Sequence, residues 1–279
     1  MVEREANRAP SIRVALSIPN MAEPSTLVGL GVRVEEAGWD GVFLWDHVHG
    51  SAEEPMPVAD PWTVLGALAV RTERVRLGTS ITPVARRRPQ DLARQVVTLD
   101  RLSGGRAVLG VGLGEPPEEY TSYGEQADPA LLAERLDEGL DVLAGLWTGE
   151  PFEHHGRHHT VEGAQYLPVA VQEPRVPVWT SCVVQNRATL GRAARWDGVI
   201  LAAIGEGGSI DDVPVDRVGA AVAGIDAERA PGAGPFDVAV TCASRPDADR
   251  LDAYRRAGAT WVLVTGWVDR LDELVAELG

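Results

Sequence analysis

Three short segments carry residues that could do chemistry, and each directly follows an apolar run: Asp46-His47, Thr79-Ser80-Ile81 and Gly110-x-Gly112-x-Gly114. A histidine gains or loses a proton near neutral pH, so it can serve as an acid or a base. Glycines let the backbone approach a ligand at places that a side chain would obstruct. In α/β proteins, sites are built at the carboxyl ends of parallel strands. We therefore expect the three segments to lie together at the carboxyl ends of the strands of a parallel sheet.

The elements that position these segments are clearest between residues 75 and 114. One apolar run predicts a strand over 75–79, and a second predicts a strand over 107–111 that is covered on both faces. Between them, Pro89 suits the first turn of a helix, and apolar residues recur behind it at helical spacing. This stretch is one strand–helix–strand unit.

The same alternation continues along the chain and predicts the fold. Strands are expected at residues 12–18, 41–45, 75–79, 107–111, 178–180, 198–202, 237–241 and 261–264, and helices at residues 24–37, 60–71, 130–147, 185–195, 215–228, 246–257 and 269–278, besides the one that begins at Pro89. Eight repeats predict a single α/β domain over residues 11–279, folded as a (β/α)8 TIM barrel. An open doubly wound sheet is the alternative. Residues 1–10 are expected to be disordered, and residues 150–177 to form a hairpin-like insertion after the fourth helix.

The composition excludes several classes of function. A net charge of −15 and a pI near 4.8 argue against nucleic acid or an anionic membrane as a partner. All 26 basic residues are Arg, so Schiff-base chemistry and a P-loop, which need Lys, are excluded. Two cysteines are too few for a disulfide scaffold. Because no segment has the pattern of a signal peptide or a membrane span, we expect a cytoplasmic protein.

If the barrel prediction is right, the residues just after each strand form the functional face. That face offers no His-x-His pair for a metal hydrolase, no Lys for an aldolase, and no second carboxylate to partner Glu115 as a glycosidase would need. Few of its groups could do acid–base chemistry unaided. A bound cofactor is therefore expected to carry the reaction, and no metal site is expected.

Four blocks of sequence resemble the bacterial luciferase-like superfamily: GWDGVFLWDH (38–47), RVRLGTSITPV (74–84), RRPQDLARQVVTLDRLSGGRAVLGVGLG (87–114) and RAARWDGV (192–199). Its members are flavin-dependent monooxygenases and relatives that use the deazaflavin coenzyme F420. The resemblance covers nearly the whole chain. It implies a TIM barrel with a reduced flavin or deazaflavin in its mouth.

The resemblance assigns roles to the segments at the strand ends. Asp46 and His47 would lie beside the reactive part of the cofactor ring, where His47 either exchanges a proton or anchors the loop through a hydrogen bond. The Thr79-Ser80-Ile81 segment matches a bulge that supports the ring face, and we expect a cis peptide bond between Ser80 and Ile81. Gly112 and Gly114 match positions where the backbone lies close to the cofactor, although simple tight turns would also explain them.

The cofactor phosphate is expected at the N-terminus of the helix after the fifth strand, where free N–H groups favour an anion. The family usually has glycine and serine there, but this chain has Ser181, Cys182, Val183, Val184, Gln185, Asn186 and Arg187. The two valines could narrow the phosphate site, whereas the polar residues that follow could donate hydrogen bonds to it. We therefore expect the difference from the family pattern in this segment to change the affinity for the cofactor.

Three other features allow more than one interpretation. The four histidines of HHGRHH (154–159) could bind a metal, contact the substrate as part of a lid, or belong to a solvated hairpin. Arg86-Arg87-Arg88 could attract a phosphate or an anionic substrate, or form a solvated loop. Cys182 is on the functional face but has no adjacent His to activate it.

The leading hypothesis is a luciferase-like monooxygenase that uses reduced FMN and oxygen on a small organic substrate. A flavin reductase and a second copy of the chain are possible partners, by analogy with the family. The closest alternative is an F420-dependent oxidoreductase that transfers a hydride. Two further alternatives are a barrel that binds a ligand without turnover and a metal-dependent hydrolase.

Overall fold

Eight parallel strands close into a barrel in the computed structural model, which describes residues 11–50, 56–184, 186, 189–206 and 209–266. The barrel strands are β1 (Arg13–Ile18), β2 (Gly41–Leu44), β3 (Arg76–Thr79), β5 (Ala107–Gly112), β8 (Val178–Val183), β9 (Gly198–Ile204), β11 (Asp237–Cys242) and β12 (Trp261–Thr265). The last strand, β12, pairs in parallel with β1, and Ser17 lies opposite Thr265. This closure confirms the predicted TIM barrel and excludes the open sheet.

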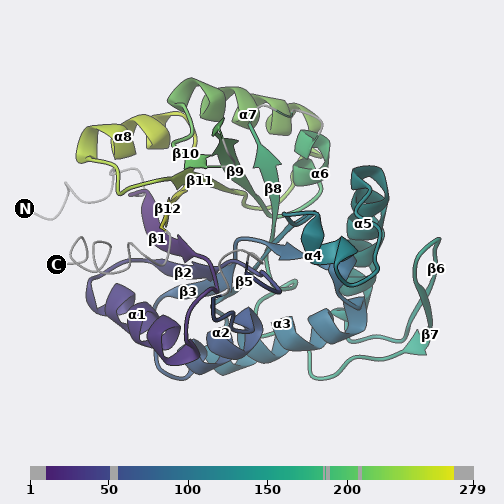
Figure 1. The fold of residues 1–279 in the computed structure, drawn as a ribbon. Coiled ribbons are helices and arrows are strands. Elements are labelled where there is room, and N and C mark those ends of the chain that lie inside the picture. Colours follow the sequence, from purple (N-terminus) through teal and green to yellow (C-terminus); the bar gives the residue numbers. More distant parts are fainter. Residues whose placement is uncertain (1–10, 51–55, 185, 187–188, 207–208, 267–279) are drawn as a thin grey trace, which may run out of the picture.

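Helices surround the barrel in the order that the sequence predicts (Figure 1). They are α1 (Pro24–Glu36), α2 (Pro61–Ala69), α3 (Pro89–Ser103), α5 (Pro129–Leu146), α6 (Leu190–Ala194), α7 (Val215–Glu228) and α8 (Ala248–Arg256). Local sequence sets their ends: the Asp60 side chain caps α2 by accepting from Thr63 N, and Gly104 ends α3 with a φ of 66°. The predicted helix at 269–278 and the prediction of a disordered N-terminus lie outside the described residues.

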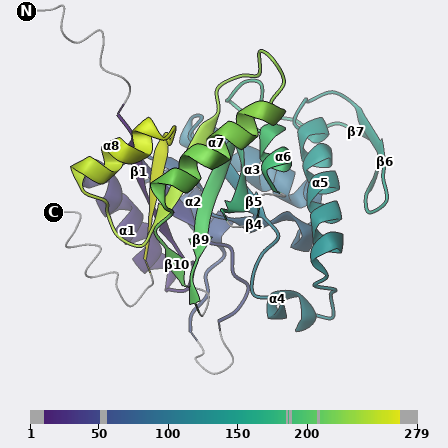
Figure 2. The same ribbon diagram turned by 90° about the horizontal axis from the view of Figure 1, so that it is seen from above.

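Four short elements at the carboxyl end of the barrel were not predicted: β4 (Thr82–Pro83), the 3-10 turn η1 (Val84–Arg86), α4 (Glu118–Thr121) and β10 (Ile210–Asp211). Each is too short to show a hydrophobic period. Figure 2 shows α4 and β10 at the same end of the barrel. The fifth barrel helix was predicted over residues 185–195. Asn186 is not helical and α6 runs from Leu190 to Ala194, whereas residues 185, 187 and 188 lie outside the described residues.

Aromatic and aliphatic side chains fill the inside of the barrel. The inner cluster comprises Ala15, Phe43, Val108, Trp179, Ile200, Ala239, Trp261 and Leu263. The rings of Phe43 and Trp179 stack with their centroids 5.4 Å apart, and Trp261 lies 5.6 Å from Trp179. The barrel is therefore a packed core, as its fold requires.

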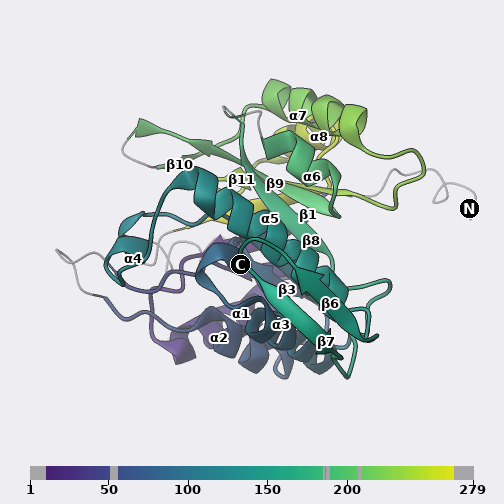
Figure 3. The same ribbon diagram turned by 90° about the vertical axis from the view of Figure 1, so that its right-hand side faces the viewer.

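The predicted insertion contains an antiparallel hairpin of β6 (Phe152–His155) and β7 (Thr160–Ala164). It lies beside α5, outside the ring of barrel strands (Figure 3). Within the described part of the chain, every helix is too short or too polar to cross a bilayer.

Candidate active site

Small and hydroxyl-bearing side chains occupy the inner face of the barrel at its carboxyl end. Ser17, Ser181 and Thr241 each lie two positions beyond a residue of the inner cluster, so strand alternation turns them into the barrel. Gly112 lies four positions beyond Val108 on β5 and therefore faces the same side. The hydroxyl of Thr241 is buried and has no hydrogen-bond partner among the described residues. The inner face thus changes from bulky and apolar to small and polar at this end.

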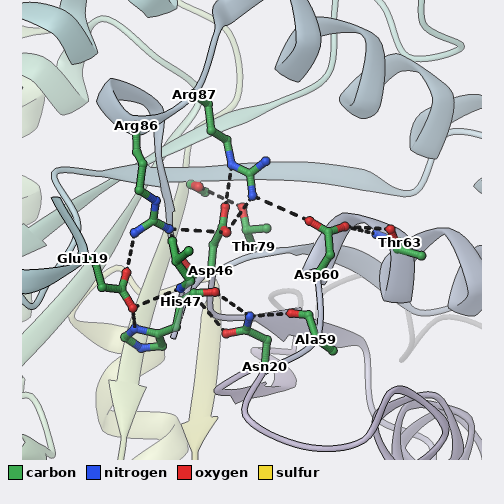
Figure 4. Close-up of polar contacts among 12 residues, drawn as sticks. Asn20, Asp46, His47, Ala59, Asp60, Thr63, Thr79, Arg86, Arg87 and Glu119 are labelled. Atoms are coloured by element: carbon green, nitrogen blue, oxygen red, sulfur yellow. Dashed lines mark hydrogen bonds and ion pairs between the residues drawn. The ribbon is translucent and has the colours of Figure 1, made fainter. Parts of the chain in front are cut away.

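His47 follows β2 and is held through both its backbone and its ring. The Asn20 side chain donates to His47 O at 2.9 Å and accepts from His47 N at 3.0 Å. The ring nitrogen Nδ1 lies 2.9 Å from Oε1 of Glu119 (Figure 4). No hydrogen bond from the described residues reaches Nε2, and 17% of the side chain is exposed. His47 is therefore fixed in place with one ring nitrogen left for exchange.

Glu119 on α4 is a site residue that sequence reasoning missed. Its carboxylate, only 1% exposed, accepts from His47, from Val48 N at 3.1 Å and from Arg86. Burial alone would raise the pKa of Glu119, but the hydrogen bond from His47 and the charges of His47 and Arg86 lower it below its ordinary value. Only a weak signal in the sequence pointed to Glu119, because acidic residues after Pro117 are typical of an ordinary solvated helix start.

Asp46 does not have a free carboxylate. Arg87 binds both of its oxygens, with Nε–Oδ2 and Nη2–Oδ1 distances of 2.9 and 2.7 Å. Arg86 also donates to the backbone carbonyl of Asp46. The solvated-loop interpretation is therefore wrong for Arg86 and Arg87, since both are largely buried and paired with carboxylates. Arg88 alone is exposed.

The peptide bond between Ser80 and Ile81 is cis, which confirms the prediction. Thr79 is fully buried and donates through its hydroxyl to the carbonyl of Gly110 at 2.9 Å. Ser80 N donates to Leu44 O at 2.9 Å. Ile81 packs against the inner cluster, so the segment borders the barrel interior as expected.

Different structural constraints require a glycine at Gly112 and at Gly114. A Cβ on Gly112 would lie 2.5 Å from Oγ of Ser181 and 3.0 Å from the Ile81 side chain. Gly114 has a φ of +87°, and a Cβ there would meet Pro83 at 2.7 Å. Gly112 therefore borders two other predicted site residues, whereas Gly114 fits the tight-turn interpretation.

The segment predicted to hold the phosphate follows β8. Ser181 lies on the inner face, Val184 packs on the main core, and Asn186 N donates to Val183 O at 2.7 Å. Gln185 and Arg187 lie outside the described residues. Cys182 is buried, which raises the pKa of its thiol, so the structure gives no support for a nucleophilic cysteine.

Two of the four histidines of the hairpin contact carboxylates of α5 through their rings. His154 Nε2 lies 3.3 Å from Glu138 and His158 Nε2 lies 3.2 Å from Glu134, both on α5. The described residues contain no cluster of three or more His, Cys, Asp or Glu that could hold a metal ion. His154 and His158 thus join the hairpin to α5, and the metal interpretation gains no support within the described residues.

Comparison with known sequences gives curated relatives over part of the chain. An F420-dependent glucose-6-phosphate dehydrogenase of Microbacterium testaceum is 38% identical over 159 residues, which is 56% of this chain and 46% of that protein. One from Nakamurella multipartita is 38% identical over 149 residues, or 50% and 42% of the two chains. The matched stretch spans less than half the length of these curated relatives.

Comparison with solved structures gives the same fold over nearly the whole chain. An F420-dependent secondary alcohol dehydrogenase with an F420–acetone adduct has a TM-score of 0.77 at 16% identity, covering 97% and 98% of the two chains. The F420-dependent tetrahydromethanopterin reductase of Methanopyrus kandleri has a TM-score of 0.74 at 18% identity, covering 96% and 97%. A type II Baeyer–Villiger monooxygenase of Pseudomonas putida with FMN has a TM-score of 0.64 at 17% identity, covering 82% and 67%.

The sequence pattern of one family, described as luciferase-like monooxygenase, matches residues 9–273. This match includes every barrel strand and the site around His47. The resemblance noted in the sequence is thereby confirmed, and the solved structures named above share the fold of this chain. The chain belongs to the luciferase-like monooxygenase family.

Proposed function

We propose that this protein is an F420-dependent oxidoreductase that transfers a hydride between F420 and a small alcohol, with His47 exchanging the hydroxyl proton. The observation that carries the proposal is the contact of His47 Nδ1 with Glu119, which leaves Nε2 for the substrate. The sequence by itself favoured FMN and oxygen. We adopt its F420 alternative because the curated relatives named above are F420-dependent.

The residues of the barrel mouth fit a planar, polar ring. Gly112 is buried against the Ser181 and Ile81 side chains, and Thr241 offers a buried hydroxyl that no described residue satisfies. These four residues would hold the ring, and Val183, Val184 and Asn186 would lie toward its phosphate tail. When bound, F420 supplies the two-electron chemistry that these side chains lack.

His47 supplies the proton transfer that hydride transfer requires. The Glu119 carboxylate accepts the Nδ1 proton, so the neutral ring presents the lone pair of Nε2. As the substrate alcohol is oxidised, Nε2 takes its hydroxyl proton, and the ionised Glu119 stabilises the resulting imidazolium. In the reverse direction, the same nitrogen returns the proton.

The substrate we propose is a small hydroxylated compound. One candidate is glucose 6-phosphate, the substrate named for the curated relatives. A simple secondary alcohol is the second, since a structural neighbour is named for that class. Arg86 and Arg87 are already paired with Glu119 and Asp46, which argues against their use as a phosphate site and favours the uncharged alcohol.

The first experiment is an anaerobic binding titration of the purified protein with F420 and with FMN, each oxidised and reduced. We expect saturable binding of F420 with much weaker binding of FMN. Reduction of bound F420 by either candidate alcohol, followed by its absorbance, tests the reaction. Binding of FMN alone, with substrate oxygenation in air, would instead support the monooxygenase hypothesis.

The matched variant is His47→Asn, which keeps a polar side chain but cannot act as a base. We expect it to bind F420 as the wild type does and to lose about 10²- to 10⁴-fold in kcat. Unchanged turnover would contradict the role of His47 and favour the loop-anchor interpretation.

A further inference from the structure

Three consecutive arginines, Arg86, Arg87 and Arg88, have three different environments. Arg88 is exposed and precedes α3. Arg87 forms the two-pronged pair with Asp46, and its side chain is 19% exposed. Arg86 is the most buried of the three, with 9% of its side chain exposed. A charge this deeply buried must be matched by its neighbours.

Arg86 lies between two buried carboxylates. It donates through Nη1 to Oε2 of Glu119 and through Nη2 to the backbone carbonyl of Asp46, and Nη2 lies 3.5 Å from Oδ1 of the same Asp46 (Figure 4). The planar guanidinium therefore joins α4 to the end of β2. A lysine could place one charge there but could not reach both acceptors with fixed geometry.

The contacts divide the two oxygens of Glu119 between two tasks. Oε2 is held by Arg86, whereas Oε1 accepts from His47 Nδ1 at 2.9 Å and from Val48 N at 3.1 Å. With both oxygens engaged, the carboxylate cannot rotate away from the imidazole without breaking a bond to Arg86. The orientation of Glu119 toward His47 thus depends on Arg86.

The electrostatics of this cluster agree with its geometry. The titratable and charged side chains around Glu119 include His47 and Asp46 after β2, Arg86 in η1 and, next to Asp46, Arg87. Tyr120, the neighbour of Glu119 on α4, stays neutral because burial raises its pKa to about 12. Arg86 is thus the positive charge in direct contact with the Glu119 carboxylate on the side away from His47.

We propose that Arg86 is a positioning residue for proton transfer: it keeps Glu119 ionised and oriented, so that the Nδ1 proton stays on His47 and Nε2 remains the acceptor. This role rests on the proposed function for its meaning in catalysis. The tautomer of His47, however, is a property of the protein without cofactor or substrate. It can therefore be measured whether or not the proposed reaction is right.

The test compares Arg86→Gln with Arg88→Gln, the same substitution at an exposed neighbour. Imidazole 15N NMR signals of His47 report which ring nitrogen carries the proton, and they are recorded on cofactor-free protein above neutral pH. We expect the wild type and Arg88→Gln to carry the proton on Nδ1. Arg86→Gln is expected to show a mixture of tautomers, with a growing share protonated on Nε2.

The conservative variant Arg86→Lys separates charge from geometry and provides a second reading if Arg86→Gln does not fold. Since lysine cannot hold both Glu119 and Asp46, we expect a smaller change of the same kind. A folded Arg86→Gln with the wild-type tautomer would overturn the proposal. If only Arg86→Lys folds, an unchanged tautomer in that variant would overturn it as well.

Kinetics then connect the tautomer to catalysis. Groups that orient a histidine typically contribute about 10- to 100-fold, so Arg86→Gln should lower kcat by that factor with KM and the F420 dissociation constant nearly unchanged. If the wild type does not turn over F420 but Arg86→Gln changes the tautomer of His47, the positioning role stands and the proposed function is refuted. Full turnover with an altered tautomer would instead overturn the role of Arg86 in proton transfer.

Discussion

The imidazole of His47 and the carboxylate of Glu119, separated by 72 positions in the sequence, meet with Nδ1 and Oε1 2.9 Å apart. One follows the second barrel strand and the other belongs to the short helix α4. The contact fixes the ring of His47 at the mouth of the barrel. It also makes the ionisation of Glu119 part of the stability of this site.

The pH dependence of stability should therefore carry a contribution from Glu119. Its pKa is lowered in the folded protein, so it stabilises the fold above its unfolded pKa of about 4.3, and that contribution is lost as pH falls through the folded pKa. We expect Glu119→Gln to be less stable than the wild type at pH 7, with the two stabilities converging as pH falls below about 4. Urea unfolding at several pH values measures this.

The control for that measurement is Glu118→Gln on the same short helix, because Glu118 is exposed. It should follow the wild-type curve at every pH. A constant stability difference between Glu119→Gln and the wild type from pH 7 to pH 3 would contradict the ion-pair account.

Gly112→Ala should destabilise the protein by about 1 to 3 kcal/mol, since the added methyl group collides with Ser181 and Ile81. Trimming Ser181 as well, in Gly112→Ala with Ser181→Ala, should recover part of this loss. The control is Gly66→Ala on α2, where a Cβ meets nothing within 4 Å and a helical alanine is favourable by up to about 1 kcal/mol. Equal effects of the two glycine substitutions on unfolding would contradict the crowding at Gly112.

Asn20→Asp should be strongly destabilising at neutral pH. Asn20 is fully buried, and its amide donates to the carbonyls of His47 and Ala59 at 2.9 and 2.6 Å. A carboxylate there leaves both acceptors unpaired, at about 1 to 3 kcal/mol each. Because a protonated carboxyl can donate one bond, the loss of stability should shrink as pH falls. A loss that stays the same at acid pH would point to a cause other than the missing donors.

Two buried threonines should respond in opposite directions to the same change. Thr79→Val removes the hydroxyl that donates to Gly110 O at 2.9 Å, so we expect a loss of about 1 kcal/mol in the free energy of unfolding. Thr241→Val removes a buried hydroxyl that has no partner among the described residues, so stability should stay the same or rise.

The same pair of variants separates stability from ligand binding. If the Thr241 hydroxyl serves the cofactor, as proposed, Thr241→Val should weaken F420 binding while leaving the protein at least as stable. Undiminished F420 affinity in a stable Thr241→Val would remove Thr241 from the site.

Much of the fold could be predicted from the sequence because its determinants are local. Prolines at the starts of α1, α2 and α3, Asp60 as a cap and Gly104 at a helix end are all read from neighbouring residues. The alternation of eight strands with helices allowed the barrel to be predicted. The same reading of strand ends placed His47 directly after the second strand. Even the cis bond at Ser80-Ile81 could be expected from family resemblance.

The errors arose where the local pattern was weak. The helix after the fifth strand was predicted from residue 185, but the described residue Asn186 is not helical and α6 begins at Leu190. The run of arginines has the composition of a solvated loop, yet Arg86 and Arg87 turn inward because buried carboxylates face them. A charge run shows that cations are present and does not show what pairs with them.

By itself, the sequence determined the barrel and the position of His47 after its second strand, because the periods of strands and helices can be read from adjacent residues. Only the tertiary structure decided the partners of His47 and the arginines. Glu119 reaches His47 across the loop after β5, and Arg86 reaches Glu119 from η1. Such pairs depend on how loops from different strands fold over one end of the barrel. A charge buried there is costly unless an opposite charge pairs with it.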